Sequence, residues 1–402
     1  MPDRSAAGVP GGVPFIERFA SALFVVVALD AFLGGGGRLF EIGPLTLRMV
    51  LFGVAMITTV VLLATRGRLD AGVRVALGLT LVGMLVHAGP VAIGLLSGNS
   101  RADVAIDVKP LAYLAMAPFF ASTLGTRADA NRVVHLVTIA ASILAALYLV
   151  AFGLLASGIV AHASVYHAFV GTGEIMFRSE ATFFYKGFLY LAVGLVFVLS
   201  GAAGVGRAAA VPIGAALLLT MTRGLIISAA LGVVVLLGLR DRRALLAALP
   251  IAAAVSFGVL WVLPALNWSY SEQRAISNAI RVDDVAFFLE NADVVSLLFG
   301  SGFGTPLNGR MLVENTYLWL IWKAGLGGIA FWFAPLALCV RASAQAWRRP
   351  AARPATAAFL SASVVVYALS ATNPFLLNPI GMSIVLISMS CLHTLGRTAR
   401  HA

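Results

Sequence analysis

The stretch LLLTMTRGLIISAALGVVVLLG, residues 217–238, sets two apolar runs on either side of a turn that carries Arg223. Neither run alternates polar and apolar residues, as the strands of a membrane-spanning barrel do. VVVALDAFL, residues 25–33, has the same unbroken character, and such runs recur along nearly the whole chain. Runs near 20 residues can each cross roughly 30 Å of hydrocarbon as a helix. The pattern therefore predicts an all-α, polytopic membrane protein.

Composition supports this class of protein, and the charge distribution predicts its topology in the membrane. Of 402 residues, 60% are hydrophobic and 11% charged, whereas a soluble chain carries about a quarter charged residues. The net charge of +11 lies largely in short loops, such as RDRR at 240–243, which favours cytoplasmic loops over a nucleic-acid surface. Twelve spans with both termini cytoplasmic satisfy this rule. Their approximate bounds are 19–33, 45–65, 73–96, 110–125, 133–157, 187–205, 208–222, 224–239, 244–266, 315–340, 355–371 and 375–395.

We expect a single integral membrane domain, residues 1–402, with two substantial segments on the outer side, 157–187 and 267–315. The short first span contains Asp30 and is interpreted as uncleaved rather than as a signal peptide. Cys339 and Cys391 fall near cytoplasmic ends of spans, where a structural disulfide is not expected. The sequence has no P-loop, which counts against an ATP-driven transporter. It also has no metal-ligand pattern, so neither a metal nor a cofactor is expected.

Cations on the outer side are unusual, because Lys and Arg normally gather in cytoplasmic loops. Each outer cation therefore needs a physical explanation. Arg223 has no acidic residue within ten positions on either side, which favours a binding role. Others have acidic neighbours that allow simple local pairing or snorkelling. These are Arg38 with Glu41, Arg101 and Lys109 with Asp103 and Asp107, and Arg178 with Glu180. The remaining outer cations are Lys186, Arg274, Arg281, Arg310 and Lys323.

Several arginines at one membrane surface suit an anionic headgroup. Guanidinium groups bind phosphate oxygens through two parallel hydrogen bonds and stay charged at any relevant pH. A lipid-linked pyrophosphate would fit such a site, and arginine could also stabilise the charge growing on a pyrophosphate leaving group.

The outer segment 267–315 contains a periodic stretch. Within residues 271–291, Val282, Val285, Phe288 and Leu289 recur at spacings of three and four. This predicts an amphipathic helix that lies on the surface or caps the bundle. The opposite face offers charged side chains that are solvated or contribute to a site. They are Arg274, Arg281, Asp283, Asp284 and Glu290.

The segment GSGFGTPLNGRMLVENTYLWL, residues 300–320, places an acid and an amide at the start of an aromatic-rich span. Its glycines predict a turn that packs closely against backbone or ligand. Glu314 and Asn315 have two interpretations. The first is helix capping, which the helix dipole favours. The second is a general base, Glu314, that takes a proton from a sugar hydroxyl beside the arginines.

In sequence order, TMTRG, AIRVDD, LLFGSGFG and VENTYLWLIWKAGLGG resemble the motifs of the O-antigen ligase and Wzy polymerase superfamily. The resemblance covers residues 220–328, and the N-terminal spans match only in general character. Members are similar to GT-C membrane glycosyltransferases and use undecaprenyl-diphosphate-linked glycans as donors, without nucleotide sugar or metal. The resemblance therefore implies an inverting glycosyltransferase in a bacterial inner membrane, with its active site at the periplasmic face.

Carried onto this chain, the resemblance makes Glu314 the catalytic base. Arg223 and Arg281 would contact the pyrophosphate, with Arg178 as a third contact and Arg274 and Arg310 as further candidates. Gly302 and Gly304 would shape the turn. The supporting residues would be Asn315, Lys186 and Tyr317.

The chain departs from the ligase pattern at one point, because Glu314 stands where ligases usually have a histidine base. The outer histidines, His162 and His167, lie in another segment and are weak replacements. The departure favours a polymerase of O-antigen or exopolysaccharide repeat units over a ligase that uses lipid A–core. The partners are then a lipid-linked donor, a glycan acceptor and membrane lipids, with a chain-length regulator or flippase as a further partner.

The sequence leaves two other classes of protein open. A flippase or anionic-solute transporter would distribute charges through the midplane and show two related halves with broken spans. A noncatalytic partner in polysaccharide export would tolerate neutral replacements of Arg223 and Glu314. The clustering of unusual charges at one face favours surface chemistry.

Overall fold

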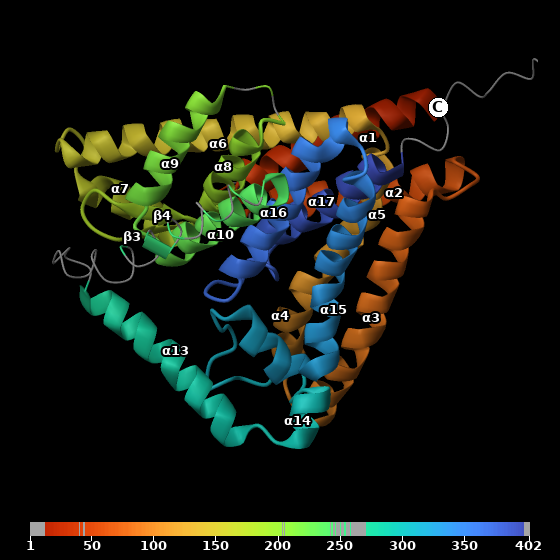
Figure 1. The fold of residues 1–402 in the computed structure, drawn as a ribbon. Helices are drawn as coiled ribbons and strands as arrows, with labels where there is room; N and C mark the ends of the chain where they lie inside the picture. Colours follow the sequence, from red (N-terminus) through yellow and green to blue (C-terminus); the bar gives the residue numbers. More distant parts are fainter. Residues whose placement is uncertain are drawn as a thin grey trace, which may run out of the picture.

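The computed structural model describes residues 13–39, 41–42, 45–202, 204, 206–241 and 271–397, with isolated residues between 243 and 258. These residues form a helical bundle with two small hairpins, which confirms the all-α prediction (Figure 1). The α-helices are α1 (Val13–Leu33), α2 (Leu47–Thr65), α3 (Ala71–Leu96), α4 (Arg101–Ala112), α5 (Met116–Thr123), α6 (Arg127–Ala156), α7 (His162–Phe169), α8 (Leu189–Ser200), α9 (Ala210–Leu219), α10 (Arg223–Arg240), α13 (Ser271–Asn291), α14 (Val294–Phe299), α15 (Thr316–Ala346), α16 (Arg353–Leu369) and α17 (Pro379–Arg397).

Short elements complete the fold. The hairpins pair strands β1 (Glu41–Ile42) with β2 (Leu45–Thr46) and β3 (Ile175–Phe177) with β4 (Phe183–Tyr185), both antiparallel. The 3₁₀ turns are η1 (Tyr113–Ala115), η2 (Val170–Thr172), η3 (Lys186–Phe188), η4 (Arg207–Ala209) and η6 (Pro350–Ala352).

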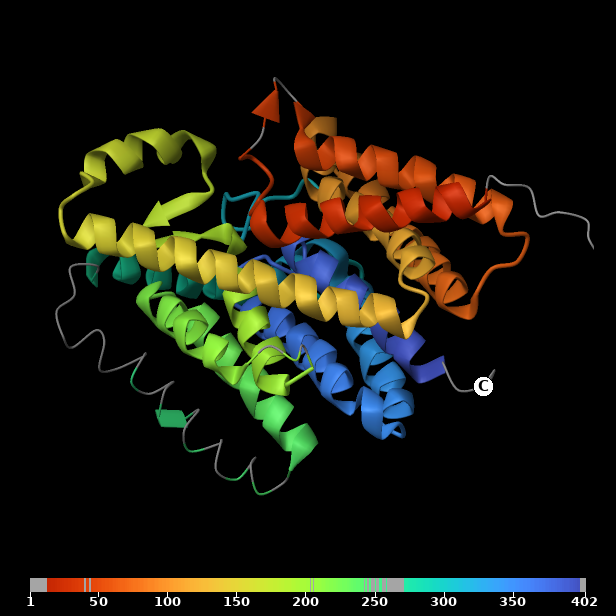
Figure 2. The same ribbon diagram turned by 90° about the horizontal axis from the view of Figure 1, so that it is seen from above.

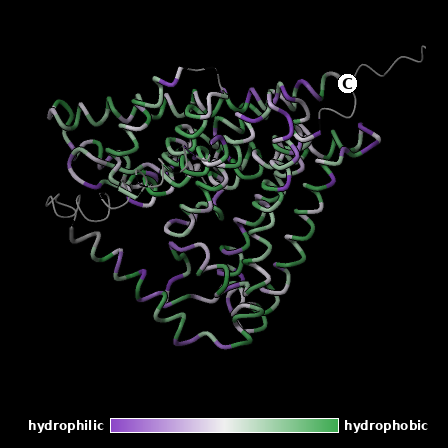
Figure 3. The backbone as a smooth tube through the Cα atoms, viewed as in Figure 1, coloured by the Kyte–Doolittle hydropathy of each residue, from purple (hydrophilic) through white to green (hydrophobic). Residues whose placement is uncertain are grey.

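The predicted spans that fall on described residues overlap helices, although span 110–125 covers the end of α4, η1 and α5. Span 244–266 lies largely outside the described residues. Among the described residues, eight helices are long and apolar enough to cross a membrane, and two more, Lys186–Ser200 and Arg207–Leu219, are apolar but shorter. Figure 3 shows the helices of the bundle as mainly hydrophobic, with hydrophilic residues prominent in α13 and the loops beside it.

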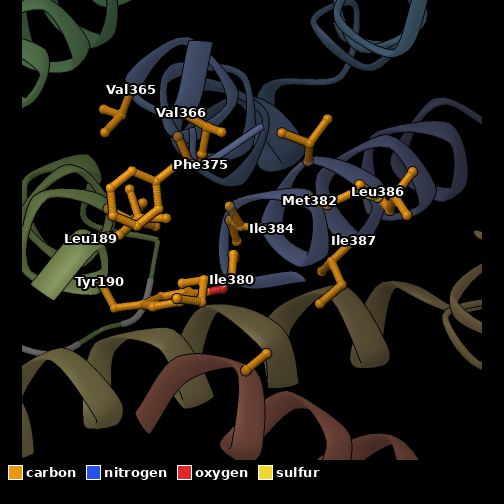
Figure 4. Close-up of a cluster of buried hydrophobic side chains, with 14 of the residues drawn as sticks. Leu189, Tyr190, Val365, Val366, Phe375, Ile380, Met382, Ile384, Leu386 and Ile387 are labelled. Carbon is orange, nitrogen blue, oxygen red and sulfur yellow. Dashed lines mark hydrogen bonds between the residues drawn. The ribbon is translucent and has the colours of Figure 1, made fainter. Parts of the chain in front are cut away.

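The core lies where α8, α16 and α17 meet. Ile380 and Ile384 of α17 are fully buried beside Leu189 and Tyr190 of α8 (Figure 4). The Tyr190 hydroxyl donates to the Ile380 carbonyl at 2.8 Å, so this polar atom is satisfied within an apolar environment. Small residues bring neighbouring helices close, because a Cβ at Gly232 of α10 would collide with Val365 of α16. Close backbone approach of this kind is how helices associate in lipid.

The predicted start of span 110–125 is wrong. Residues 101–109, which the predicted bounds leave between two spans, belong to α4, which η1 and α5 extend to Thr123. Arg38 does pair with Glu41, at 3.9 Å, as expected. Asp107, however, turns into the bundle and pairs with Lys323 at 2.5 Å, because both side chains project into the interior and are fully buried there.

Two features flank the bundle. Helix α13 runs obliquely along one side of the bundle to α14 (Figure 1). Seen from above, the segment with α7 and the β3–β4 hairpin forms a lobe beside one end of α6 (Figure 2). Glu174 fixes this lobe to the glycine turn after α1 by accepting from the Gly36 N–H at 2.6 Å.

Candidate functional site

The predicted amphipathic helix is confirmed as α13, and one stretch of it, residues 278–284, gathers side chains from several distant segments. Arg281 and Glu314 form an ion pair with 2.5 Å between Nη2 and Oε2. Their side chains are 33% and 46% exposed, so the pair is partly open to solvent, although Glu314 Oε2 itself is buried. Arg281 Nη2 also donates to the Thr372 carbonyl at 3.4 Å, in the connection between α16 and α17.

A second arginine–carboxylate pair lies one turn further along. Arg310 pairs with Asp284 and donates to the Ile280 carbonyl at 3.5 Å. The side chain of Asp284 is only 3% exposed, so the interpretation of Asp284 as a solvated residue is wrong. It points toward the loop that carries Arg310, where pairing offsets the cost of burial. Asp283 and Glu290 are exposed, as expected.

The third arginine reaches α13 from the start of α10. Arg223 Nη2 donates to the Asn278 side-chain oxygen at 3.2 Å. The neighbouring Gly224 packs against Thr372, since a Cβ there would collide with the Thr372 hydroxyl. The contacts of Arg223, Arg281 and Arg310 therefore lie along residues 278–284 of α13, and six steps of 1.5 Å give about 9 Å of helix axis. We call this region, with Glu314, the α13 site.

Capping and ion pairing are divided between the two neighbours that precede α15. The Asn315 side-chain oxygen accepts from the backbone N–H groups of Tyr317 and Leu318, at 3.0 and 3.1 Å. Asn315 is thus the N-cap of α15. The carboxylate of Glu314 is directed to Arg281 instead. This division leaves Glu314 available for chemistry, because the helix end does not require it.

The glycine turn has the close packing that the sequence predicts. Gly302 and Gly304 both have positive φ, 88° and 83°. A Cβ at Gly302 would collide with the backbone of α3 at Gly94. The Gly304 N–H donates to Asp107 Oδ2 at 2.7 Å. Only glycine combines this conformation with such close approach.

Four other candidates lie elsewhere or have no described side chain. Arg178 lies in the lobe, with its guanidinium over the Phe184 ring at 5.9 Å. Lys186 starts η3, and its backbone N–H donates to the Glu174 carbonyl at 3.1 Å. Tyr317 faces α16, where its hydroxyl donates to the Tyr367 carbonyl at 2.6 Å, so it supports packing rather than the site. Arg274 belongs to α13, but its side chain lies outside the described residues.

The apolar positions of α13 divide between packing and exposure. Phe288 contacts Trp322 of α15, with ring centroids 6.2 Å apart. Val282, Val285 and Leu289 are exposed, by 66%, 43% and 72%. An exposed apolar stripe on one side and a charged site on the other is the arrangement of a helix at a membrane interface.

Sequence reasoning missed Asn278 and Thr372 as site residues. Asp284 had a local signal, because its spacing of three from Arg281 puts both on one helical face. Thr372 has no comparable signal, since it contributes a backbone carbonyl that any residue type could supply.

The fold and the site together define a polytopic membrane protein with arginine–carboxylate pairs at one end of its bundle. No family model matches the chain. The O-antigen polymerase of Shigella flexneri is 26% identical to it over 365 residues, which is 89% of this chain and 91% of that protein. The predicted resemblance is confirmed to this extent: the chain is similar to an O-antigen polymerase along about nine-tenths of both proteins.

Proposed function

We propose that the chain is a Wzy-type polysaccharide polymerase. It transfers a glycan from undecaprenyl diphosphate to a hydroxyl of another lipid-linked repeat unit, at the periplasmic face of the inner membrane. The observation that carries this proposal is the α13 site, where three arginines and Glu314 meet at the end of a membrane bundle. Similarity to an O-antigen polymerase along nine-tenths of the chain supports it.

The arginines would hold the diphosphate of the donor. Arg281 and Arg310 are each 33% exposed at the side chain, so a ligand can reach their guanidinium groups. Each group has five donors in a fixed fork, more than its present partners use. A diphosphate therefore can share or replace these partners, as the strength of charge-assisted hydrogen bonds to phosphate allows.

Glu314 would act as the base. The acceptor hydroxyl oxygen attacks the anomeric carbon, and its proton passes to the Glu314 carboxylate. The bond between the anomeric carbon and the diphosphate oxygen breaks, and undecaprenyl diphosphate leaves with the bonding electrons. Attack from the face opposite the leaving group inverts the anomeric configuration. The arginines stabilise the negative charge that develops on the diphosphate, with no metal in the step.

Donor binding would also release the base. In the structure Arg281 holds Glu314 at 2.5 Å. When a diphosphate draws Arg281 away, the carboxylate gains room to accept the hydroxyl. The pair thus couples occupation of the donor site to activation of the acceptor.

The test uses purified protein in nanodiscs with undecaprenyl-diphosphate-linked repeat units, and reads the product as a ladder on a gel. We expect a ladder from the wild type, none from Glu314→Gln, and a normal one from Glu290→Gln, which removes an exposed carboxylate of α13 away from the site.

Other products would overturn the assignment in distinct ways. A single transfer that needs lipid A–core would make the protein a ligase. An absence of transfer to either acceptor, with movement of the lipid across a sealed bilayer, would place it among transporters. Neutral replacements at Arg223 and Glu314 that leave the ladder intact would indicate a noncatalytic role.

A further inference from the structure

A buried ion pair lies beneath the α13 site, within the bundle. Lys323 Nζ of α15 and Asp107 Oδ2 of α4 are 2.5 Å apart, and both side chains are fully buried. Burial of two charges costs several kcal/mol per ion, and their mutual attraction often fails to repay it. A stable fold alone would be served as well by two apolar side chains, so the pair calls for another explanation.

Both members of the pair hold the loop that leads to the site. Lys323 Nζ donates to the Met311 carbonyl at 3.3 Å, and Asp107 Oδ2 accepts from the Gly304 N–H at 2.7 Å. Met311 is the neighbour of Arg310 and lies three residues before Glu314. The pair therefore fixes the loop on both sides of its tip, close to the two residues that contribute to the α13 site.

The backbone of α15 also holds this loop, through a break in the helix at Gly325. Gly325 interrupts the helix with φ of 63°, and a side chain there would collide with the backbone at Leu298. The break frees carbonyls of the preceding turn, which accept hydrogen bonds from the loop. Ser301 N–H donates to the Trp322 carbonyl at 2.7 Å, and Gly302 N–H to the Lys323 carbonyl at 3.2 Å. Lys323 thus holds the loop with both its side chain and its backbone.

Helix α3 and its outer connection add a third support. The Phe303 N–H donates to the Pro90 carbonyl at 2.9 Å. The Asn99 side-chain nitrogen donates to the Phe303 carbonyl at 3.0 Å and to the Thr305 hydroxyl at 2.8 Å. Residues 301–311 are therefore fixed to α3, α4 and α15 together, whereas α13 meets the same loop from the solvent side.

We propose that Asp107 and Lys323 are positioning residues for the transfer reaction: through Gly304 and Met311 they set where Arg310 and Glu314 stand relative to the diphosphate and the acceptor hydroxyl. The inference rests on the proposed function for the chemistry, but its structural part concerns the loop alone. A small displacement matters in such a site, because 1 Å of misplacement can cost about 10²-fold in rate.

Two double variants separate positioning from packing. Asp107→Asn with Lys323→Gln removes both charges but keeps an acceptor for Gly304 and a donor for Met311. Asp107→Leu with Lys323→Met removes the charges and both loop contacts, while it fills the same space. Both double variants lack the two charges. A difference in kcat or in hydrogen exchange between them therefore reports the loss of the contacts to the loop.

The measurements are thermal stability, the kcat and donor KM of ladder formation, and hydrogen exchange of residues 301–314. We expect both double variants to unfold within a few degrees of the wild type. The amide pair keeps kcat within about threefold, whereas the apolar pair loses about tenfold or more in kcat. Hydrogen exchange of 301–314 is faster only in the apolar pair.

Equal kcat and equal exchange in the two double variants would overturn the proposal and reduce the pair to packing. If the apolar pair does not fold, Asn99→Leu takes its place, since it removes two contacts to the same loop from a partly exposed position. It should lower kcat and speed exchange in the same direction. Asp107→Leu with Lys323→Gln, which removes the acceptor for Gly304 but keeps a donor for Met311, then tests the pair itself, and unchanged kcat and exchange in it would overturn the proposal. Hydrogen exchange needs no activity, so failure of the polymerase assignment is distinguishable from failure of the positioning role.

Discussion

Two ion pairs are connected through the loop that precedes α15, and they differ in how exposed their side chains are to solvent. At the α13 site, Arg281 and Glu314 are 33% and 46% exposed at the side chain. Beneath it, Lys323 and Asp107 are 0% exposed. An exposed pair is weak and can exchange partners with a ligand, whereas a buried pair cannot open without leaving an uncompensated charge. The outer pair is suited to chemistry and the inner pair to holding geometry.

The largest effect should come from breaking the inner pair on one side only. Lys323→Met alone leaves Asp107 buried without its cation, which should cost about 3–5 kcal/mol in the free energy of unfolding. Thermal unfolding in detergent measures this. The comparison variant is Glu41→Gln, which breaks the exposed pair with Arg38 and should cost about 1 kcal/mol or less. Similar losses in the two variants would refute the contrast between buried and exposed pairs.

An intermediate effect, on the donor KM, is expected when Arg281 keeps its positive charge but loses the two parallel donors of its guanidinium group. Arg281→Lys retains one positive charge and loses the paired donors that match phosphate oxygens. The donor KM should rise about tenfold, corresponding to about 1.4 kcal/mol, with little change in stability. Kinetics with increasing donor concentration give the KM. Arg38→Lys, away from the α13 site, serves as the control, and a KM raised equally in both would argue against a specific role for Arg281.

The smallest effect concerns the cap of α14. The backbone N–H and hydroxyl of Ser296 bond to Asp293 and lower the pKa of its carboxyl. Because the folded-state pKa lies below the unfolded value, the cap stabilises α14 above the ordinary carboxyl pKa. This contribution is lost as pH falls through the lowered value.

Hydrogen exchange of residues 294–299, corrected for intrinsic rates, should show α14 opening more readily at low pH. Asp293→Asn keeps a capping oxygen that does not titrate, so it should remove most of this dependence. A dependence that survives unchanged in Asp293→Asn would place its origin in another group.

The spans and α13 were predictable because their signals are local. Apolar runs near 20 residues mark spans, and spacings of three and four mark an amphipathic helix. The contacts that build the site join residues far apart in the chain, such as Arg223 with Asn278 and Arg281 with Thr372, and no local pattern encodes them.

Three side chains lie where local sequence does not place them. Asp107 was assigned to a neighbouring cation because nearness in sequence stood in for nearness in space, but α4 turns its side chain toward Lys323, 216 residues away. Composition alone favours a solvated Asp284, because charged residues are usually exposed, yet Asp284 is buried in its pair with Arg310. The choice between Glu314 and Asn315 as the cap depends on side-chain direction, which adjacent polar residues do not reveal.

The most direct test of the central claim is the rate of transfer at saturating donor for Glu314→Gln against wild type. General base catalysis supplies about 10²–10⁴-fold in rate. We therefore predict a loss of about 100-fold or more in kcat, with the donor KM within about threefold, because the arginines remain. A kcat close to that of the wild type would contradict the account and leave Glu314 as only the partner of Arg281.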